Sequence, residues 1–412
     1  MPSPARRLLL QPYVARLLVG TLVGRLPTGM APVAILLLAT GQGSTLAQGG
    51  LLCALYGLAA ALGQPLLGRI IDRRGQSLVT VLAVLVTTAG LLVLPLTDAT
   101  AQPAYAVTAV LLAGASTPPL EAGLRALWPV VLPDPVQRRA ALALDTGSQG
   151  LVFIAGPPLV AVLSATTGPA VALAATAGLG LLGALLVVTS APSRRWKPAA
   201  APATTGLLGP LRDPGLRWLL VALTGTGAAL GALTVWAVTQ ADRTGIALLS
   251  GAIPAALSVG SLLGGLLYGR RTWPGSLRAQ LTVSAASFAM AWLPLTFAAG
   301  PWAAGAAPVL PGLFLTVTIT TAFLAVETLA PAGTLTEAYA WLIAAVGVGQ
   351  AAGTALAGNL SGDHALGAAL PAAAAATTPL VLLAGRRALA PTGSVPRGRH
   401  RRTAHTRPAI PA

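Results

Sequence analysis

Four polar or charged side chains interrupt long apolar segments of the sequence: Arg25, Glu121, Asp145 and Gln149. An ionised side chain near the centre of a bilayer costs from about 3 to more than 10 kcal/mol, so each one needs a partner or serves a function. Arg25 is the most costly of them, because it lies about 18 Å along a helix beyond Tyr13. Two interpretations of Arg25 stay open: it takes part in ligand binding or coupling, or it only neutralises an acid and fixes packing.

The rise of a helix predicts which of these side chains meet. Along a helix counted from Arg139, Asp145 lies about 9 Å and Gln149 about 15 Å into the membrane. Gln149 is therefore level with Arg25, and the arginine side chain can angle toward Asp145. The sequence predicts a cluster of these three residues. Glu121 has a separate explanation, because Arg125 stands one turn later on the same helix face and can neutralise it.

The composition of the chain indicates that these residues stand in a membrane protein. Of its 412 residues, 55% are hydrophobic and 9% are charged, and the mean hydropathy is +0.76. A soluble domain would contain about 25% charged residues. Apolar stretches of about 20 residues, each able to cross roughly 30 Å of hydrocarbon, recur about twelve times. We expect spans near residues 14–40, 46–67, 77–97, 105–127, 140–165, 169–189, 217–239, 245–267, 279–299, 308–330, 336–358 and 366–385.

Repetition within the chain indicates two halves. Sliding the sequence by about 197 residues lays Gly265 to Arg271 on Gly68 to Arg74, which keeps both arginines and loses Asp72. We therefore expect an all-α membrane protein with twelve transmembrane helices in two pseudo-symmetric six-helix halves, residues 1–191 and 217–387. The Ala/Pro-rich segment 192–216 is expected to be a cytoplasmic linker, and the basic segment 388–412 a disordered cytoplasmic tail.

The distribution of arginine predicts the orientation, because cytoplasmic loops carry an excess of positive charge. With the N-terminus inside, nearly all of the formal charge of +16 falls in inner segments, whereas Arg243 is the basic residue of the presumed outer loops. We expect a multi-pass protein of the cell membrane with both termini in the cytoplasm. The basic tail is interpreted as a solvated segment near anionic lipid, not as a nucleic-acid site.

Residues for enzymatic or metal chemistry are scarce. Cys53 is the sole cysteine, and His364, His400 and His405 lie outside the expected spans. Neither residue type can form a metal or catalytic cluster within the bundle. We expect no enzyme activity, no metal, no cofactor and no nucleic-acid partner, and a monomer embedded in the lipid bilayer.

A charged loop between the second and third spans has a distinctive spacing: Gly68-Arg69-Ile70-Ile71-Asp72-Arg73-Arg74-Gly75. The pattern G-x-x-x-D-R-x-G resembles the loop between the second and third helices of the major facilitator superfamily of secondary transporters. The wider segments Arg25 to Met30 and Gly333 to Gly349 look like a group of actinobacterial facilitators. The resemblance covers the whole chain and implies alternating access to a cavity between the halves.

The resemblance also implies a cytoplasmic gate. In this family the charged loop faces the start of span eleven, so Asp72 and Arg73 are expected to pair around Glu337. The segment Thr334 to Glu337 offers another explanation of that glutamate, because it fits a capping box in which Thr334 closes the helix start.

Pseudo-symmetry places a second gate contact at span five. Arg270 and Arg271 would approach its start near Asp145, which leaves Asp145 as either a gate residue or a proton carrier. Glu327 ends its helix, where a negative charge opposes the helix dipole. A basic residue of the charged loop is expected to offset it: Arg69 or Arg74.

Span five also contains Gly156-Pro157-Pro158, which resembles the Gly-Pro pair of exporters in this family. The match is partial, because Val152 and Val160 stand where the exporter pattern has glycine, and prolines also kink membrane helices without a further role. Cavity-facing candidates are large or polar residues of the spans: Met30, Trp236, Gln240 and Trp292.

These observations favour a secondary transporter that exports a small, largely apolar organic compound in exchange for protons. A proton-coupled or facilitative importer of a small metabolite or sugar would have the same fold. A membrane sensor that transports nothing is a more remote alternative, because the sequence offers no sizeable domain outside the membrane.

Overall fold

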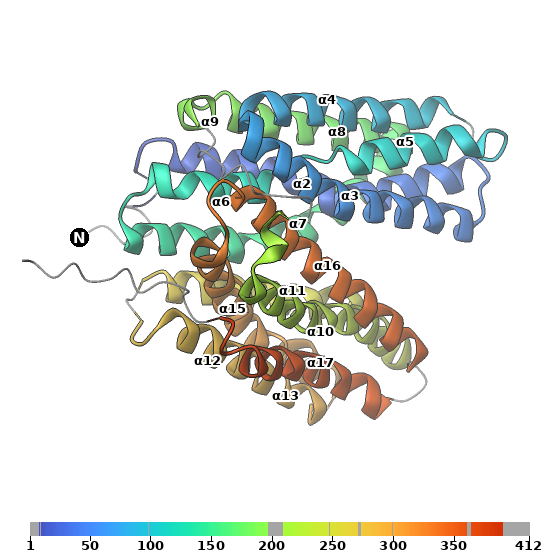
Figure 1. Cartoon of the computed structure of the whole chain (residues 1–412). Coiled ribbons are helices and arrows are strands. Elements are labelled where there is room, and N and C mark those ends of the chain that lie inside the picture. Colours follow the sequence, from blue (N-terminus) through green and yellow to red (C-terminus); the bar gives the residue numbers. More distant parts are fainter. Residues whose placement is uncertain are drawn as a thin grey trace, which may run out of the picture.

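The computed structural model describes residues 8, 10–97, 99–196, 209–246, 248–270, 273–298, 300–360 and 364–389, and all regular elements in these ranges are helices. They form two bundles, the first in blue to green and the second in yellow-green to red (Figure 1). This agrees with the all-α architecture expected from the apolar stretches.

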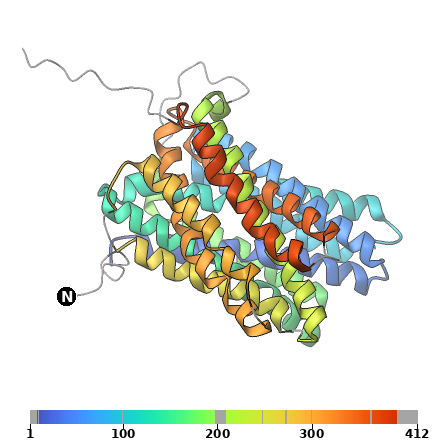
Figure 2. The same ribbon diagram turned by 90° about the horizontal axis from the view of Figure 1, so that it is seen from below.

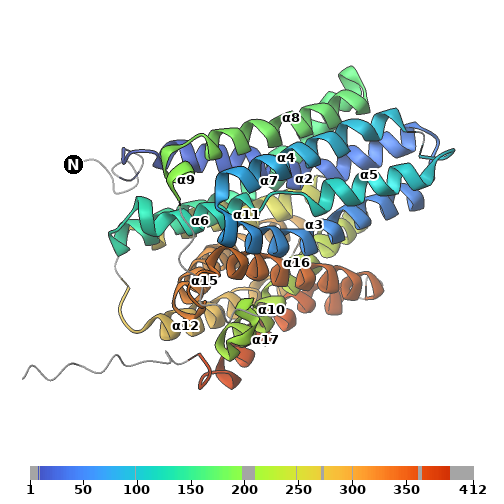
Figure 3. The ribbon, with the colours of Figure 1, turned by 45° about the horizontal axis from the view of Figure 1, so that its top comes forward.

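Within the described residues, the first bundle contains seven long helices and two short elements. Its elements are α2 (Val14–Gly41), α3 (Leu46–Arg74), α4 (Gln76–Val93), η1 (Leu94–Leu96), α5 (Pro103–Ala115), α6 (Leu120–Val131), α7 (Pro135–Thr167), α8 (Pro169–Val188) and α9 (Ala191–Arg195). Figure 3 shows α8, α4 and α5 on the face of this bundle that is turned away from the second one.

The second bundle follows residues 197–208 of the expected linker, which lie outside the described residues. Its elements are η2 (Gly209–Arg212), α10 (Pro214–Thr244), α11 (Leu249–Tyr268), α12 (Leu277–Met290), α13 (Leu293–Thr296), α14 (Pro301–Ala306), α15 (Val309–Leu329), α16 (Leu335–Asn359) and α17 (His364–Ala384). Seen from below, α17 in red lies on the outside of this bundle (Figure 2). Residues 390–412 of the expected tail lie outside the described residues too.

The helices account for the twelve expected spans, two of them in pieces. Within the described residues, 10 helical segments are long and apolar enough to cross a membrane. The span expected at 105–127 is divided into α5 and α6, and the span expected at 279–299 into α12 and α13. The first break falls at Pro118 and Pro119, since neither residue can donate a backbone hydrogen bond and each disfavours the helical conformation of the residue before it.

The two bundles touch mainly on one side of the molecule. Contacts between them join α3 to α16, α7 to α11, α7 to α15 and α6 to α16. At Gly147 of α7 an added Cβ atom would lie 3.0 Å from the carbonyl oxygen of Ser261, and at Gly269 it would lie 3.1 Å from Ala140 Cα. These positions belong to the first half of α7 and the last half of α11. We call this side, where α3 ends and α7 and α16 begin, the closed side; away from it the ribbons diverge (Figure 1).

A shared apolar core seals the closed side. It includes Leu127 and Trp128 of α6 together with Phe323 of α15 and Tyr339 of α16, all at most 1% exposed. Since the two bundles contribute to one core here, this side is held together by apolar burial as well as by polar contacts.

Candidate functional site

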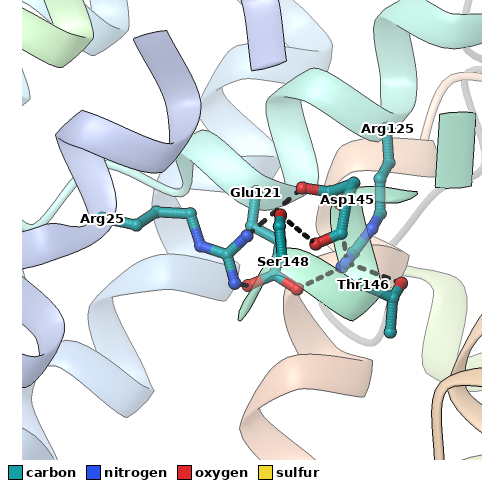
Figure 4. A network of polar contacts seen from close by, with 6 residues as sticks. All are labelled: Arg25, Glu121, Arg125, Asp145, Thr146 and Ser148. Atoms are coloured by element: carbon teal, nitrogen blue, oxygen red, sulfur yellow. Dashed lines mark hydrogen bonds and ion pairs between the residues drawn. The ribbon is translucent and has the colours of Figure 1, made fainter. Parts of the chain in front are cut away.

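Two arginines and two carboxylates form a closed ring of ion pairs inside the first bundle, which we call the charge ring: Arg25, Glu121, Arg125 and Asp145. Arg25 contacts Glu121 at 2.6 Å and Asp145 at 3.3 Å. Arg125 pairs with Glu121 one turn away on α6, and its Nη2 lies 2.8 Å from Asp145 Oδ2. Each arginine thus binds both acids, and the formal charges of the ring cancel (Figure 4).

Three helices position the charge ring. Arg25 lies on the inward face of α2, Glu121 and Arg125 share one face of α6, and Asp145 comes from α7. Close helix approach fixes these elements: at Gly29 of α2 an added Cβ atom would lie 2.7 Å from the carbonyl oxygen of Val152 in α7. The ring depends on this approach, because a wider crossing would draw Arg25 away from α7.

The charge ring is buried. Its side chains are between 0% exposed for Arg125 and 11% exposed for Glu121. Removing an ion from water costs several kcal/mol, and the cost is offset only when its partners are close and its hydrogen bonds are satisfied. The alternation of charge around the ring supplies the close partners, whereas Nε of Arg125 has no hydrogen-bond partner within the described residues. Loss of one member would leave an uncompensated charge in the bundle.

The structure brings together Arg25 and Asp145 but leaves Gln149 out. Gln149 is only partly buried and makes no hydrogen bond to the ring within the described residues. Glu121 joins the ring, and Arg125 does more than neutralise it locally, since it also reaches Asp145 and lies 3.4 Å from the hydroxyl of Thr146. In the sequence, the one-turn spacing of Glu121 and Arg125 indicated that the two side chains pair, but it did not reveal that both face α7.

A second polar site joins the two bundles at the closed side. Asp72, near the end of α3, accepts hydrogen bonds from the backbone N–H groups of Thr336 at 3.1 Å and of Glu337 at 2.8 Å. These are free N–H groups of the first turn of α16, so a carboxylate of one bundle caps a helix of the other. The expected capping box is wrong: Thr334 makes no side-chain capping hydrogen bond and instead donates to Pro331 O.

Glu337 takes its cation from Arg69. The Nε and Nη2 atoms of Arg69 lie 3.0 and 2.7 Å from the two carboxylate oxygens, a bidentate geometry. The expectation that Arg73 pairs there is wrong, since Arg73 and Arg74 are exposed at the end of α3. Asp72 and Arg69 are three residues apart and face α16 together, whereas Arg73 lies one turn beyond Arg69 along α3 and is exposed.

Glycines let the backbones of the two bundles approach each other at this second polar site. At Gly68 an added Cβ atom would lie 3.0 Å from Glu337 Cα. Gly209, the first residue of η2, has a positive φ of 45° and lies against both partners, 2.8 Å from Glu337 Oε1 and 2.9 Å from Arg69 Nη2 by the same measure. The start of η2 therefore lies against the Arg69–Glu337 pair. Gly75 also has a positive φ, of 96°, which lets the chain turn from α3 into α4.

A third contact joins α7 to α15. Arg138 Nη1 lies 3.1 Å from Glu327 Oε2, and the Tyr339 hydroxyl donates to Glu327 Oε1 at 3.2 Å. The expected partners of Glu327, Arg69 and Arg74, are wrong. Arg138 was missed because it lies in an expected cytoplasmic segment, where basic residues are common.

The pseudo-symmetric gate contact is only partly described. Arg270 is exposed at the end of α11 and forms no ion pair with Asp145 within the described residues, and Arg271 lies outside them. The end of α11 does approach the start of α7, where Gly269 meets Ala140. Asp145 itself is occupied by the two arginines of the charge ring.

The proposed cavity residues lie in the helix packing. Met30, Trp236 and Trp292 are at most 4% exposed and belong to the apolar cores of the two bundles, and Gln240 is 8% exposed. None of the four is more than 8% exposed in this conformation, and the expectation that they face a substrate cavity stays a prediction. Their size places them in the cores, because large side chains bury the most apolar area.

Gly156, the glycine of the Gly-Pro pair of α7, lies at a close helix contact. Gly156 faces α2, where an added Cβ atom would lie 3.2 Å from the Gly29 carbonyl carbon and 3.3 Å from the Met30 side chain. Pro157 lies inside the continuous helix. Among the residues that the structure describes, no group of His, Cys, Asp and Glu is arranged to hold a metal ion.

Comparisons with known proteins agree with this architecture. The family model of the Major Facilitator Superfamily matches residues 17–354. The crystal structure of the human organic anion transporter MFSD10 (TETRAN) is 18% identical, covers 94% of this chain and 100% of its own, and has a TM-score of 0.67. A comparison with curated proteins gave no match.

Two bacterial transporters have similar folds. The E. coli fucose:proton symporter FucP is 14% identical with a TM-score of 0.66, covering 90% of this chain and 97% of its own. A bacterial homologue of the iron transporter ferroportin in an outward-facing state is 15% identical with a TM-score of 0.69, covering 91% and 99%. At these identities the likeness concerns the fold.

Proposed function

Because the chain belongs to the major facilitator superfamily and is therefore a membrane transport protein, we propose that it exports a small, largely apolar organic compound in exchange for protons. The observation that carries the proposal is the charge ring. Two buried carboxylates share two arginines in one half, a short distance from the contact between halves. Such intramembrane ionisable groups are typical of proton pathways.

In this proposal, proton binding is coupled to the conformation of the protein through the net charge of the charge ring. With both acids ionised the ring is neutral, so it demands no ion from outside the protein. A proton added to Glu121 or Asp145 leaves one excess positive charge among buried groups, which favours a conformation in which water reaches the ring. The ring thereby makes the balance between conformations depend on proton binding, as exchange with protons requires.

The gate supplies the other requirement of alternating access. For the closed side to open, α16 must lose its Asp72 cap, and the Arg69–Glu337 and Arg138–Glu327 pairs must separate. All three contacts cross between the halves, so they stabilise one conformation selectively. We propose that the closed side faces the cytoplasm, which the arginine distribution supports, and that this conformation is outward-facing.

An apolar cargo fits the described residues better than a charged one. Both arginines of the charge ring already bind two carboxylates each, so neither offers a free site to an anion. Export is supported by the Gly-Pro pair of α7, which resembles that of family exporters. The fucose:proton symporter among the similar folds keeps import as the alternative.

Reconstituted protein tests the proposal. Proteoliposomes containing the pH dye pyranine would receive the uncharged compounds chloramphenicol and, separately, florfenicol as largely apolar probes, with fucose as the polar comparison. We expect proton movement opposite in direction to the movement of an apolar probe. Proton movement with fucose in the same direction, and none with the apolar probes, would replace export by symport. If an imposed pH gradient does not alter the rate of probe movement, proton coupling is excluded.

A further inference from the structure

The guanidinium group of Arg125 contacts the first half of the molecule through its edge and the second half through its flat face. Its N–H groups pair with Glu121 and Asp145 in the first half. Its flat face lies over the ring of Phe323 in α15 of the second half, with 3.5 Å between Arg125 Cζ and the ring centroid. Arg125 is 0% exposed and Phe323 is 1% exposed. One buried cation thus joins the charge ring to the opposite half.

Phe323 is also connected, through Tyr339, to the contact between Arg138 and Glu327. Its ring packs edge to face with Tyr339, with 5.5 Å between centroids and an interplanar angle of 67°. The Tyr339 hydroxyl donates to Glu327, which Arg138 of the first half also binds. Phe323 and Glu327 are one turn apart on α15 and share a face. This face therefore meets an arginine of the first half at two successive turns.

We propose that Phe323 is a positioning residue that keeps the closed side shut through its contact with the charged face of Arg125, and so links the charge ring to the conformation of the transporter. This inference rests on the proposed function, in which the charge ring is the coupling site. The contact forms only while the halves meet. Their separation at the closed side would remove the aromatic face and leave the buried guanidinium without it.

The negative face of an aromatic ring distinguishes this contact from ordinary packing. A cation is attracted by the ring quadrupole, and the attraction is strongest where water is excluded. A leucine could fill much of the same volume, but it has no quadrupole to offer. If Phe323 only fills space, the closed conformation depends on side-chain volume; if it binds Arg125, it depends on the electron density of the ring.

Fluorinated phenylalanines separate these two roles, because each fluorine withdraws electron density from the ring with little change in size. The protein would carry Cys53→Ser and spin labels at Tyr105→Cys and Trp302→Cys, which are 66% and 67% exposed and lie on different halves. Electron–electron distance measurements in nanodiscs report the fractions of the two conformations without substrate or a proton gradient. Phe323 would be replaced by its mono-, di- and trifluoro derivatives, and by Leu.

We expect the ratio of closed to open conformations at the closed side to fall stepwise with each fluorine, and by about tenfold in Phe323→Leu. Phe288 is the matched control: it is buried like Phe323, at 0% exposed, and packs on an aromatic ring, but it lies in the core of the second half. The same fluorine series there should leave the ratio unchanged.

If the ratio of closed to open conformations does not change with fluorination of Phe323 but does change in Phe323→Leu, the residue acts only through packing and the proposal is overturned. Equal responses at Phe323 and Phe288 would overturn it too. Because this measurement needs no transport, its failure is distinguishable from failure of the proposed function. A flat fluorine series together with loss of proton-driven transport in Asp145→Asn would reject the role of Phe323 alone.

Discussion

Asp72 Oδ2 accepts a 2.8 Å hydrogen bond from the backbone N–H of Glu337, so the last turn of a helix in one half caps the first turn of a helix in the other. A cap supplied by another segment is present only while the two segments touch. Helix capping by Asp and the interaction of its charge with the helix dipole together stabilise a helix start by about 1 kcal/mol. Here that free energy stabilises one conformation of the transporter.

Loss of the Asp72 charge should therefore favour opening of the closed side. We expect Asp72→Asn to lower the ratio of closed to open conformations by about fivefold and to impair transport, with substrate affinity nearly intact. Arg69→Ala should have a similar effect through Glu337, whereas Arg73→Ala, which alters an exposed side chain, should behave as the unaltered protein. Spin-label distances and substrate binding measure both properties. An Asp72→Asn protein that transports normally, or that loses binding outright, is inconsistent with a gate.

The contact of the linker with the gate predicts a second effect. Gly209→Ala adds a methyl group about 3 Å from the Arg69–Glu337 pair and should destabilise the closed conformation by about 1–3 kcal/mol. Gly245 is the matched control, because it too has a positive φ, of 68°, but an added Cβ atom there meets nothing within 4 Å. Gly245→Ala should carry the backbone strain without a shift of conformation. Equal shifts in the two variants would show that the linker contact is incidental.

The orientation of the chain can be tested with single cysteines. In a Cys53→Ser background, we expect an impermeant thiol reagent to label Gln102→Cys, in the loop before α5, on intact cells and to leave Arg195→Cys unlabelled until the membrane is permeabilised. Both side chains are exposed, so access to the reagent decides the result. Labelling of Arg195→Cys alone on intact cells would invert the proposed topology.

The charge ring predicts strong non-additivity between its members. Arg25→Ala leaves Asp145 and Glu121 with one shared arginine, and Asp145→Asn leaves excess positive charge, so each change alone should destabilise the protein by about 3–5 kcal/mol. The double variant restores neutrality and should cost less than the sum of the two. Thermal unfolding in detergent gives the three differences. Strictly additive losses would indicate that the two residues do not interact.

The sequence predicted the elements better than the contacts between them. Apolar length and arginine distribution are local properties, and they indicated the helical spans without reference to other segments. The prolines at 118 and 119 carried the signal for the broken fourth span, but membrane helices tolerate proline often enough that the sequence did not decide it.

Contacts of the gate depend on which face of each helix meets the other half. The family resemblance of the charged loop implied that Asp72 approaches Glu337. The choice of Arg69 over Arg73 follows from where the start of α16 lies along α3, and the trans cap replaces the capping box that the local sequence favours. Arg125 was interpreted as a local partner of Glu121. Its contact with Phe323 requires the docking of two halves, which spacing along the chain does not encode.

Comparison of net transport with exchange tests the central role of the charge ring most directly. Proteoliposomes containing Asp145→Asn or Glu121→Gln would be assayed for proton-driven net movement of the apolar probe that the unaltered protein moves, and for exchange of labelled against unlabelled probe without a gradient. We expect one of the two variants to lose proton-driven movement while its exchange stays within about threefold of the unaltered protein. Proton-driven movement that persists in both variants, or exchange that fails in both to the same extent, would contradict a coupling site in the charge ring.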